Sequence, residues 1–203
     1  MRPIKNYFKF GYRYIWWIIF RTRFKKLGKN SFIYNPILIT PSYIYCGKNV
    51  KVFKSCRIQG ITKYNNTYFS PTIRLEDNVS IQQNLHLTCA NSIVIGENTA
   101  IASNVTITDI HHPYENINIP IEKQDIEVKD VTIGKNCKIY NNAVILPGVH
   151  IGNHVTIGAN SVVTRDVPDF CVATGAPAKI FKKYNIETKQ WGKTNPDGSF
   201  ITI

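Results

Sequence analysis

The stretch IGKNCKIYNNAVILPGVHIGNHVTIGANSVVTRD, residues 133–166, carries an aliphatic side chain at every sixth position. These positions hold Ile133, Ile139, Ile145, Ile151, Ile157 and Val163. Small or β-branched residues follow four places after most of them, at Cys137, Ala143, Val149, Val155 and Ser161. A period of six fits neither a lone helix nor an alternating strand. It is typical of a β-helix, in which three short strand–turn units close one coil, so the pattern predicts a core of stacked Ile and Val.

The same period extends upstream, with two interruptions. One run holds Leu75, Ile81, Leu87 and Ile93, and after a shift of two residues a second run holds Ile95, Ile101 and Ile107. A weaker run comprises Cys46, Val52 and Ile58. Gly, Asn and Asp cluster at the unit corners, where left-handed backbone conformations are needed. Residues 60–71 and 109–130 break the pattern, so we expect two loops that leave the stack, of which the longer carries function.

Charge is concentrated at the amino terminus. Of 25 Lys and Arg in the 203 residues, nine lie in residues 1–35, which contain no Asp or Glu. This segment also contains YRYIWWIIF, residues 12–20, an apolar run too short to span a bilayer. We therefore expect a short basic amphipathic helix. It would lie on an anionic membrane surface, cap the open end of the solenoid, or do both. Nucleic-acid binding is disfavoured because no basic stripe continues into the repeats.

The five cysteines are odd in number and form no CxxC pair. Several occupy the small inward position of a repeat unit, where Cys behaves as a small apolar residue. With no cleavable signal peptide recognised, we expect reduced thiols and a cytoplasmic protein, with a peripheral contact to the inner face of the membrane as one role of the basic segment.

The residues best suited to chemistry lie where the longer interruption begins, in TDIHHPYE, residues 108–115. A histidine can remove a proton from a hydroxyl near neutral pH, and the rim of a rigid β-helix would fix its position. Pro113 restricts the backbone just after the pair His111-His112. Asp109 is near enough in sequence to hold one imidazole nitrogen and set its tautomer.

Three stretches carry a resemblance to a known family: ITDIHHPYE (107–115), NNAVILPGVHIGNHVTIGANSVVTRDVP (141–168) and ATGAPAKIFKK (173–183). Over residues 36–183 the chain resembles the hexapeptide-repeat acyltransferases, in the branch of maltose, galactoside and surface-polysaccharide O-acetyltransferases. The resemblance implies a left-handed parallel β-helix and a homotrimer with acetyl-CoA between neighbouring subunits. It divides the chain into a basic segment (1–35), the acyltransferase domain (36–183) and a tail (184–203).

The resemblance also implies roles for individual residues. The general base falls on His112, with His111 as the fallback, and the acetyl group passes directly to an acceptor hydroxyl without an acyl-enzyme. The implied acceptor-site residues are Gln82, Asn84, His111 and Glu115, and the implied CoA-binding residues are Asn141, Ala159, Thr164, Arg165, Lys179 and Lys182. Two positions depart from the family: Gln82 replaces a common asparagine, and Lys138-Ile139-Tyr140 replaces Trp-Ile-Gly.

The expected function is therefore transfer of an acetyl group from acetyl-CoA to a sugar hydroxyl, in capsule, lipopolysaccharide or other surface-glycan synthesis. An N-acetyltransferase acting on an amino sugar or nucleotide-sugar is the nearest alternative, because one histidine could serve both acceptors. A zinc enzyme similar to the γ-carbonic anhydrases would need three converging histidines from among His86, His111 and His112, with His150 and His154 farther along. Adjacent histidines diverge on an extended segment, so we expect no metal. A non-catalytic scaffold is the remaining alternative.

Overall fold

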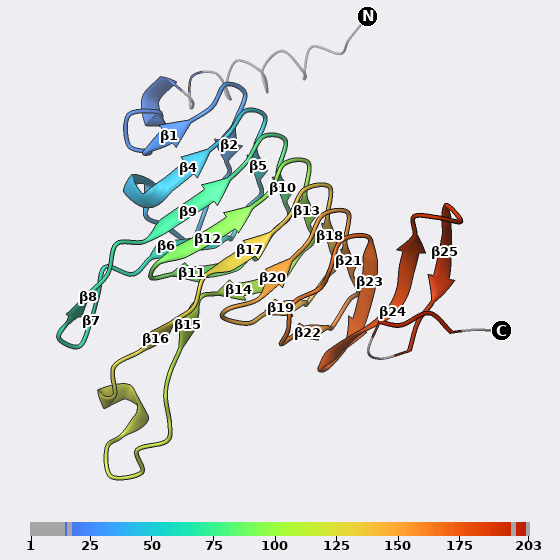
Figure 1. Cartoon of the computed structure of the whole chain (residues 1–203). Helices are drawn as coiled ribbons and strands as arrows, with labels where there is room; N and C mark the ends of the chain where they lie inside the picture. The colour runs from blue at the N-terminus through green and yellow to red at the C-terminus, as the bar shows by residue number, and fades with distance from the viewer. Residues whose placement is uncertain (1–14, 16–17, 196–197, 202–203) are drawn as a thin grey trace, which may run out of the picture.

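The computed structural model describes residues 15, 18–195 and 198–201. They form a left-handed parallel β-helix whose coils follow one another along a single axis, as the sequence predicts (Figure 1). Three sheets form its sides, and each coil contributes one short strand to each sheet.

The first sheet contains β1 (Lys26–Leu27), β4 (Ile44–Cys46), β9 (Thr72–Leu75), β12 (Ser92–Ile95), β17 (Val131–Ile133) and β20 (His150–Ile151). The second contains β2 (Phe32–Ile33), β5 (Lys51–Val52), β10 (Ser80–Ile81), β13 (Ala100–Ile101), β18 (Lys138–Ile139), β21 (Thr156–Ile157), β23 (Cys171–Gly175), β24 (Ala178–Asn185) and β25 (Gln190–Lys193). The third contains β3 (Leu38–Ile39), β6 (Arg57–Gly60), β11 (His86–Cys89), β14 (Thr106–Thr108), β19 (Val144–Ile145) and β22 (Val162–Val163). A 3-10 turn, η1 (Pro41–Tyr43), precedes β4.

The core is the predicted aliphatic column. Ile133 pairs with Ile151, Ile139 with Ile157 and Ile145 with Val163, each three six-residue units further along the chain. The upstream runs join the same columns, and their members are buried. The shift of two residues has a local cause. Strands β9 and β12 are each four residues long, so Ile93 and Ile95 both point inward, above Ile73 and Leu75.

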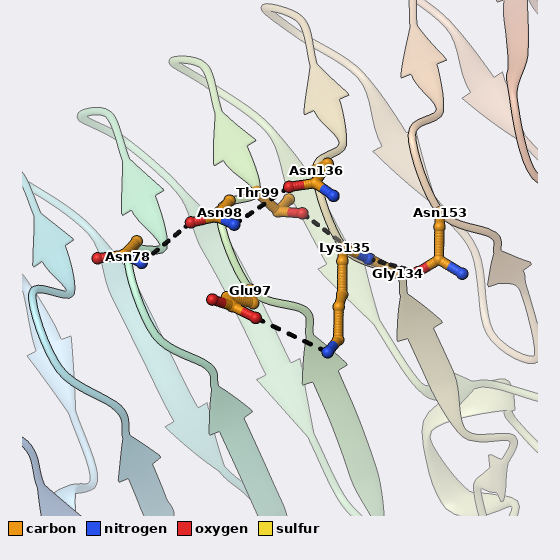
Figure 2. Close-up of polar contacts among 8 residues, drawn as sticks. All are labelled: Asn78, Glu97, Asn98, Thr99, Gly134, Lys135, Asn136 and Asn153. Atoms are coloured by element: carbon orange, nitrogen blue, oxygen red, sulfur yellow. Dashed lines mark hydrogen bonds and ion pairs between the residues drawn. The ribbon is translucent and has the colours of Figure 1, made fainter.

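Asparagines at the corner between the first and second sheets adopt the left-handed conformation that the sequence predicts. Asn78, Asn98 and Asn136 have φ values of 62°, 59° and 58°. Each side-chain amide donates to the next asparagine: the Asn78 Nδ2 to Asn98 Oδ1 distance is 3.0 Å, and the Asn98 Nδ2 to Asn136 Oδ1 distance is 3.1 Å (Figure 2). A neutral hydrogen bond contributes roughly 0.5–1.5 kcal/mol net. This asparagine ladder therefore links successive coils outside the core.

Beside this ladder, successive coils approach each other so closely that only certain residue types fit. A Cβ on Gly134 would lie 2.5 Å from the carbonyl oxygen of Gly152, so only glycine fits there. The Thr99 hydroxyl donates to the Gly134 carbonyl at 2.8 Å, and the Lys135 backbone N–H donates to Asn153 Oδ1 at 2.9 Å (Figure 2). These bonds give the polar groups of a tightly packed corner the partners they need.

The two predicted interruptions are excursions from one corner, between the third and first sheets. The first, residues 61–71, follows β6 and contains the hairpin β7 (Lys63–Tyr64) and β8 (Thr67–Tyr68). The second, residues 109–130, follows β14. It begins and ends with the antiparallel pair β15 (Ile110–His111) and β16 (Glu127–Val128), and it contains the turn η2 (Ile121–Lys123). Both project from the same side of the β-helix (Figure 1).

The ends of the β-helix lie outside the predicted domain boundaries. Strands β1 and β2 already pair with β4 and β5, so the stack begins at Lys26 and not at residue 36. Strand β24 runs antiparallel to β23 and ends at Asn185, two residues beyond residue 183. The tail continues into β25, and Trp191 packs edge-on against Tyr184, with ring centroids 5.6 Å apart. The tail therefore extends the second sheet.

The expected amino-terminal helix falls largely outside the described residues, although Ile15 and residues 18–20 are helical. Within the part of the chain that the structure describes, no helix is long and apolar enough to cross a bilayer. The five cysteines are buried with free thiols. Burial raises the pKa of Cys46 to about 12, so this thiol stays protonated and unreactive.

Candidate active site

A groove of about 320 Å³ lies between the outer face of the third sheet and the two excursions. Its floor comes from β6, β11 and β14, and its walls come from the segments that leave the stack. The polar residues that line it are Arg57, Tyr64, His86, Thr88, Thr106, Thr108 and His112. Of the two adjacent histidines, His112 lines the groove, whereas His111 lies on β15 with its ring 6.0 Å from that of Tyr114. This placement favours His112 over His111 as the reactive imidazole.

His112 is held by Tyr64, a residue that no pattern in the sequence indicates. Tyr64, on the first excursion, places its hydroxyl oxygen 3.4 Å from His112 Nδ1. The two rings meet edge-on with their centroids 5.3 Å apart. The same hydroxyl donates to the Glu122 carboxylate at 2.8 Å. No sequence signal pointed to Tyr64, because the contact joins residues that are 48 positions apart on two irregular segments.

Asp109 has a different role from the one expected. Its carboxylate accepts backbone N–H groups from Ala90 at 2.8 Å, Asn91 at 2.8 Å and Ser92 at 3.0 Å, and it also accepts the Cys89 thiol at 3.4 Å. The side chain is fully buried, and these donors occupy both oxygens. Burial raises the pKa of the Asp109 carboxyl, while the backbone N–H groups act in the opposite direction. Asp109 therefore fixes the turn after β11 instead of orienting a histidine.

The remaining polar groups of the groove stack from coil to coil. Arg57, His86 and Thr106 are aligned partners on β6, β11 and β14. The Thr88 hydroxyl donates to the Thr108 hydroxyl at 3.0 Å, in the neighbouring column. Partial burial, together with the positive charge of Arg57, lowers the pKa of His86. The floor thus offers hydroxyls and one cation, groups suited to a polar acceptor.

Two of the expected acceptor residues lie elsewhere. Gln82 and Asn84 are at the corner between the second and third sheets, on the far edge of the third sheet from His112. The expectation that Asn84 shares a strand face with Gln82 is wrong: Asn84 is a turn residue with φ of 62°, and its amide donates to Asn104 Oδ1 at 2.9 Å. Glu115 is on the second excursion, where its carboxylate accepts the Tyr114 N–H at 2.9 Å.

The expected CoA residues lie at the same two edges of the third sheet and on β24 of the second sheet. Asn141 and Ala159 are equivalent positions on successive coils at the second-to-third corner, and the Asn160 N–H donates to the Asn141 carbonyl at 2.9 Å. Thr164 and Arg165 follow β22 at the third-to-first corner, the corner from which the His112 excursion leaves. Lys179 and Lys182 lie on β24 at the end of the stack. One copy of the chain therefore does not bring all of these residues together.

The histidines proposed for a zinc site are also separated. His86 and His112 share the groove, but His111 packs against Tyr114. Across residues 15, 18–195 and 198–201, no three His, Cys, Asp or Glu side chains are grouped so as to hold a metal ion.

Known proteins share the repeat of this chain. Residues 130–165 match the family described as "Bacterial transferase hexapeptide (six repeats)". The galactoside O-acetyltransferase of Lactococcus lactis is 30% identical over 168 residues, which cover 82% of this chain and 67% of that protein. The chain belongs to the hexapeptide-repeat transferase family.

Other similar proteins match a smaller share of their own length or share the fold alone. The putative lipopolysaccharide biosynthesis O-acetyl transferase WbbJ of Escherichia coli is 43% identical over 128 residues, 60% of this chain and 65% of that protein. The match to the E. coli galactoside O-acetyltransferase covers 61% of that protein, so the chain spans less than two thirds of these two relatives. The N-acyltransferase AntD of Bacillus cereus, in crystals with dTDP and coenzyme A, shares the fold: its TM-score is 0.69 at 20% identity, covering 84% of this chain and 90% of that one.

Proposed function

We propose that this protein transfers an acetyl group from acetyl-CoA to a hydroxyl of a sugar during the synthesis of a bacterial surface glycan. The observation that carries the proposal is the imidazole of His112 in the lining of a polar groove on a rigid β-helix. The 43% identity to a putative lipopolysaccharide O-acetyl transferase supports both the reaction and the class of acceptor.

The reaction requires one proton transfer and one substitution at the thioester carbonyl carbon. His112 removes the proton of the acceptor hydroxyl while that oxygen bonds to the thioester carbonyl carbon. The resulting tetrahedral intermediate expels the CoA thiolate, which takes the proton back from the imidazolium. No acyl-enzyme forms. A general base of this kind contributes on the order of 10²–10⁴ in rate, and alignment of the two substrates contributes further.

The distribution of site residues supports a homotrimer with shared sites. One edge of the third sheet carries His112, Thr164 and Arg165, and the other edge carries Gln82 and Asn141. In a ring of three copies, the first edge of one subunit faces the second edge of its neighbour, because cyclic symmetry repeats one heterologous contact. Each cleft then receives both groups of residues, which a single copy keeps apart.

The donor end of the cleft would be recognised by charge. Lys179 and Lys182 on β24, and Arg165 after β22, are cations that suit the phosphates of CoA. The backbone groups at the Asn141 and Ala159 corner suit the pantetheine arm, whose amides need hydrogen-bond partners. With its reduced thiols, we place the enzyme in the cytoplasm, and the basic segment 1–35 would bring it to the inner face of the membrane.

The proposal is tested with purified protein, acetyl-CoA and a panel of sugar acceptors that present either hydroxyls or amines. Release of CoA is followed with a thiol reagent, and the product is identified by mass spectrometry. His112→Ala should lower kcat at least a hundredfold, while His111→Ala keeps most of the activity. A large loss in His111→Ala alone would move the base to His111, and transfer to amines only would make the enzyme an N-acetyltransferase.

Binding of CoA is measured separately by calorimetry. Lys179→Ala should weaken CoA binding severalfold, while Lys48→Ala, at the opposite end of the stack, leaves it unchanged. If the wild-type chain binds no CoA, the protein is a scaffold and the proposal fails.

A further inference from the structure

The two excursions meet at a single hydroxyl group. Tyr64 on the first excursion reaches Glu122 on the second, with its oxygen 2.8 Å from Glu122 Oε2 and 3.0 Å from the Glu122 carbonyl oxygen. Beside it, Asn65 Nδ2 donates to the Gln124 carbonyl at 3.2 Å. Gln124 in turn braces its own excursion, because its Nε2 donates to the carbonyls of Asn116 and Ile119 at 3.1 Å and 3.0 Å. Tyr64 thus sits at a defined point beside His112.

The number of protons on each group decides which atom is the donor in the hydrogen bonds of the Tyr64 hydroxyl. A tyrosine hydroxyl has one proton to donate and lone pairs to accept with. Glu122 offers a carboxylate oxygen at 2.8 Å, whereas His112 Nδ1 is 3.4 Å away. A charge-assisted bond is the shorter and stronger of the two, so the proton goes to Glu122. The bond between His112 Nδ1 and the tyrosine oxygen then requires that Nδ1 carry the hydrogen.

We infer that Tyr64, itself held by Glu122, is a positioning residue that fixes His112 as the Nδ1–H tautomer and leaves the Nε2 lone pair free to take the acceptor proton. The inference rests on the proposed function for its catalytic consequence, although the tautomer can be measured without any substrate. The bond to Glu122 also raises the pKa of Tyr64 above its ordinary value, so the phenol keeps its proton.

This arrangement replaces the one that sequence spacing suggests. Asp109 is committed to three backbone N–H groups and a thiol, so its carboxylate does not orient the imidazole. In an imidazole base, the partner of one ring nitrogen sets the protonation state of the other. Here that partner is a tyrosine whose hydroxyl donates to a carboxylate.

Tyr64→Phe isolates the hydroxyl, because the phenyl ring keeps the edge-on contact with His112. Tyr68→Phe is the matched control: Tyr68 lies on the same hairpin, is 74% exposed, and contacts Lys63 instead of His112. We expect Tyr64→Phe to lower kcat about tenfold while the KM for acetyl-CoA stays within twofold, on the scale of an impaired general base. Tyr68→Phe should match the wild type in both constants.

The tautomer is read directly from protein labelled with ¹⁵N at histidine. At neutral pH, the wild-type His112 signals, assigned by their absence in His112→Gln, should show a protonated Nδ1 and an unprotonated Nε2. Tyr64→Phe should shift the pair toward the average of the two tautomers, and Tyr68→Phe should not.

The outcomes separate this inference from the proposed function. An unchanged His112 spectrum in Tyr64→Phe, or a wild-type His112 that carries its hydrogen on Nε2, overturns the inference even if the enzyme is active. A wild-type protein that transfers no acetyl group refutes the proposed function, while the spectra still decide whether Tyr64 sets the tautomer. A Tyr64→Phe variant that loses thermal stability and changes KM, with the tautomer intact, assigns Tyr64 a purely structural role.

Discussion

The regular coils of residues 131–163 and the two excursions obey different rules. In the coils, each side chain contacts its equivalent on the next coil, so one short pattern repeated along the chain specifies strands, register and core. In the excursions, the decisive contacts join unlike residues from distant segments, such as Tyr64 with Glu122 and His112. In the proposed mechanism, the coils provide rigidity and the second excursion provides the reactive histidine. This difference between coils and excursions can be tested by substituting residues in the core, at the start of the second excursion and at the corners.

The largest effect is expected in the regular coils. Ile139 is fully buried between Ile101 and Ile157, so Ile139→Ala removes methyl groups that the rigid stack cannot replace. We expect a loss of about 2–5 kcal/mol in the free energy of unfolding, measured by urea denaturation. Lys138→Ala, on the outward face of the same strand, should change it by less than about 0.5 kcal/mol. A small effect at Ile139 would mean that the coils are not a close-packed column.

The next effect concerns the junction between coil and excursion. In Asp109→Asn, the amide nitrogen cannot accept the backbone N–H groups that the carboxylate oxygens accept. Leaving a buried donor without a partner costs about 1–3 kcal/mol, so denaturation should show a loss of that size. The control is Asp130→Asn, an exposed carboxylate bonded to the Asn91 amide. If Asp109→Asn instead kept its stability and lost only kcat, Asp109 would act on the histidine after all.

The smallest effect is expected at the corners. Asn98→Ala removes two ladder bonds and forces alanine to adopt φ near 59°, whereas Asn98→Gly removes the bonds and tolerates the backbone. The left-handed conformation costs a non-glycine residue about 1–2 kcal/mol. Alanine should therefore lower the free energy of unfolding by about 1 kcal/mol more than glycine does. Equal losses in the two variants would show that the ladder, and not the backbone, makes asparagine necessary there.

The sequence predicts most of the β-helix and little of the site's interior. The stacking of Ile133 on Ile151 and the left-handed asparagines follow from local rules that repeat. The domain boundaries at residues 36 and 183 stay predictions, and the period of six does not reveal that β1, β2 and β24 also pair with the stack.

The errors at the site have a common physical cause. Asp109 is near the histidines in sequence, but its carboxylate points toward the backbone of the preceding coil, which spacing along the chain cannot reveal. The role of Tyr64 could not be predicted from the sequence because its partners belong to another excursion. The resemblance to a family motif predicts His112 as the base; this residue lines the groove, and its role stays a prediction.

The reversal of direction at β24 has a consequence for assembly. A parallel stack ends in a row of free backbone groups that another molecule could extend, and copies added end to end would then grow into a fibre. Strand β24 runs back against β23 and β25 pairs antiparallel with β24, so this hairpin occupies the edge of β23 on which a further coil would add its strand. This reversal thus limits growth at the carboxyl-terminal end, while whole turns could be gained or lost in evolution without disturbing it.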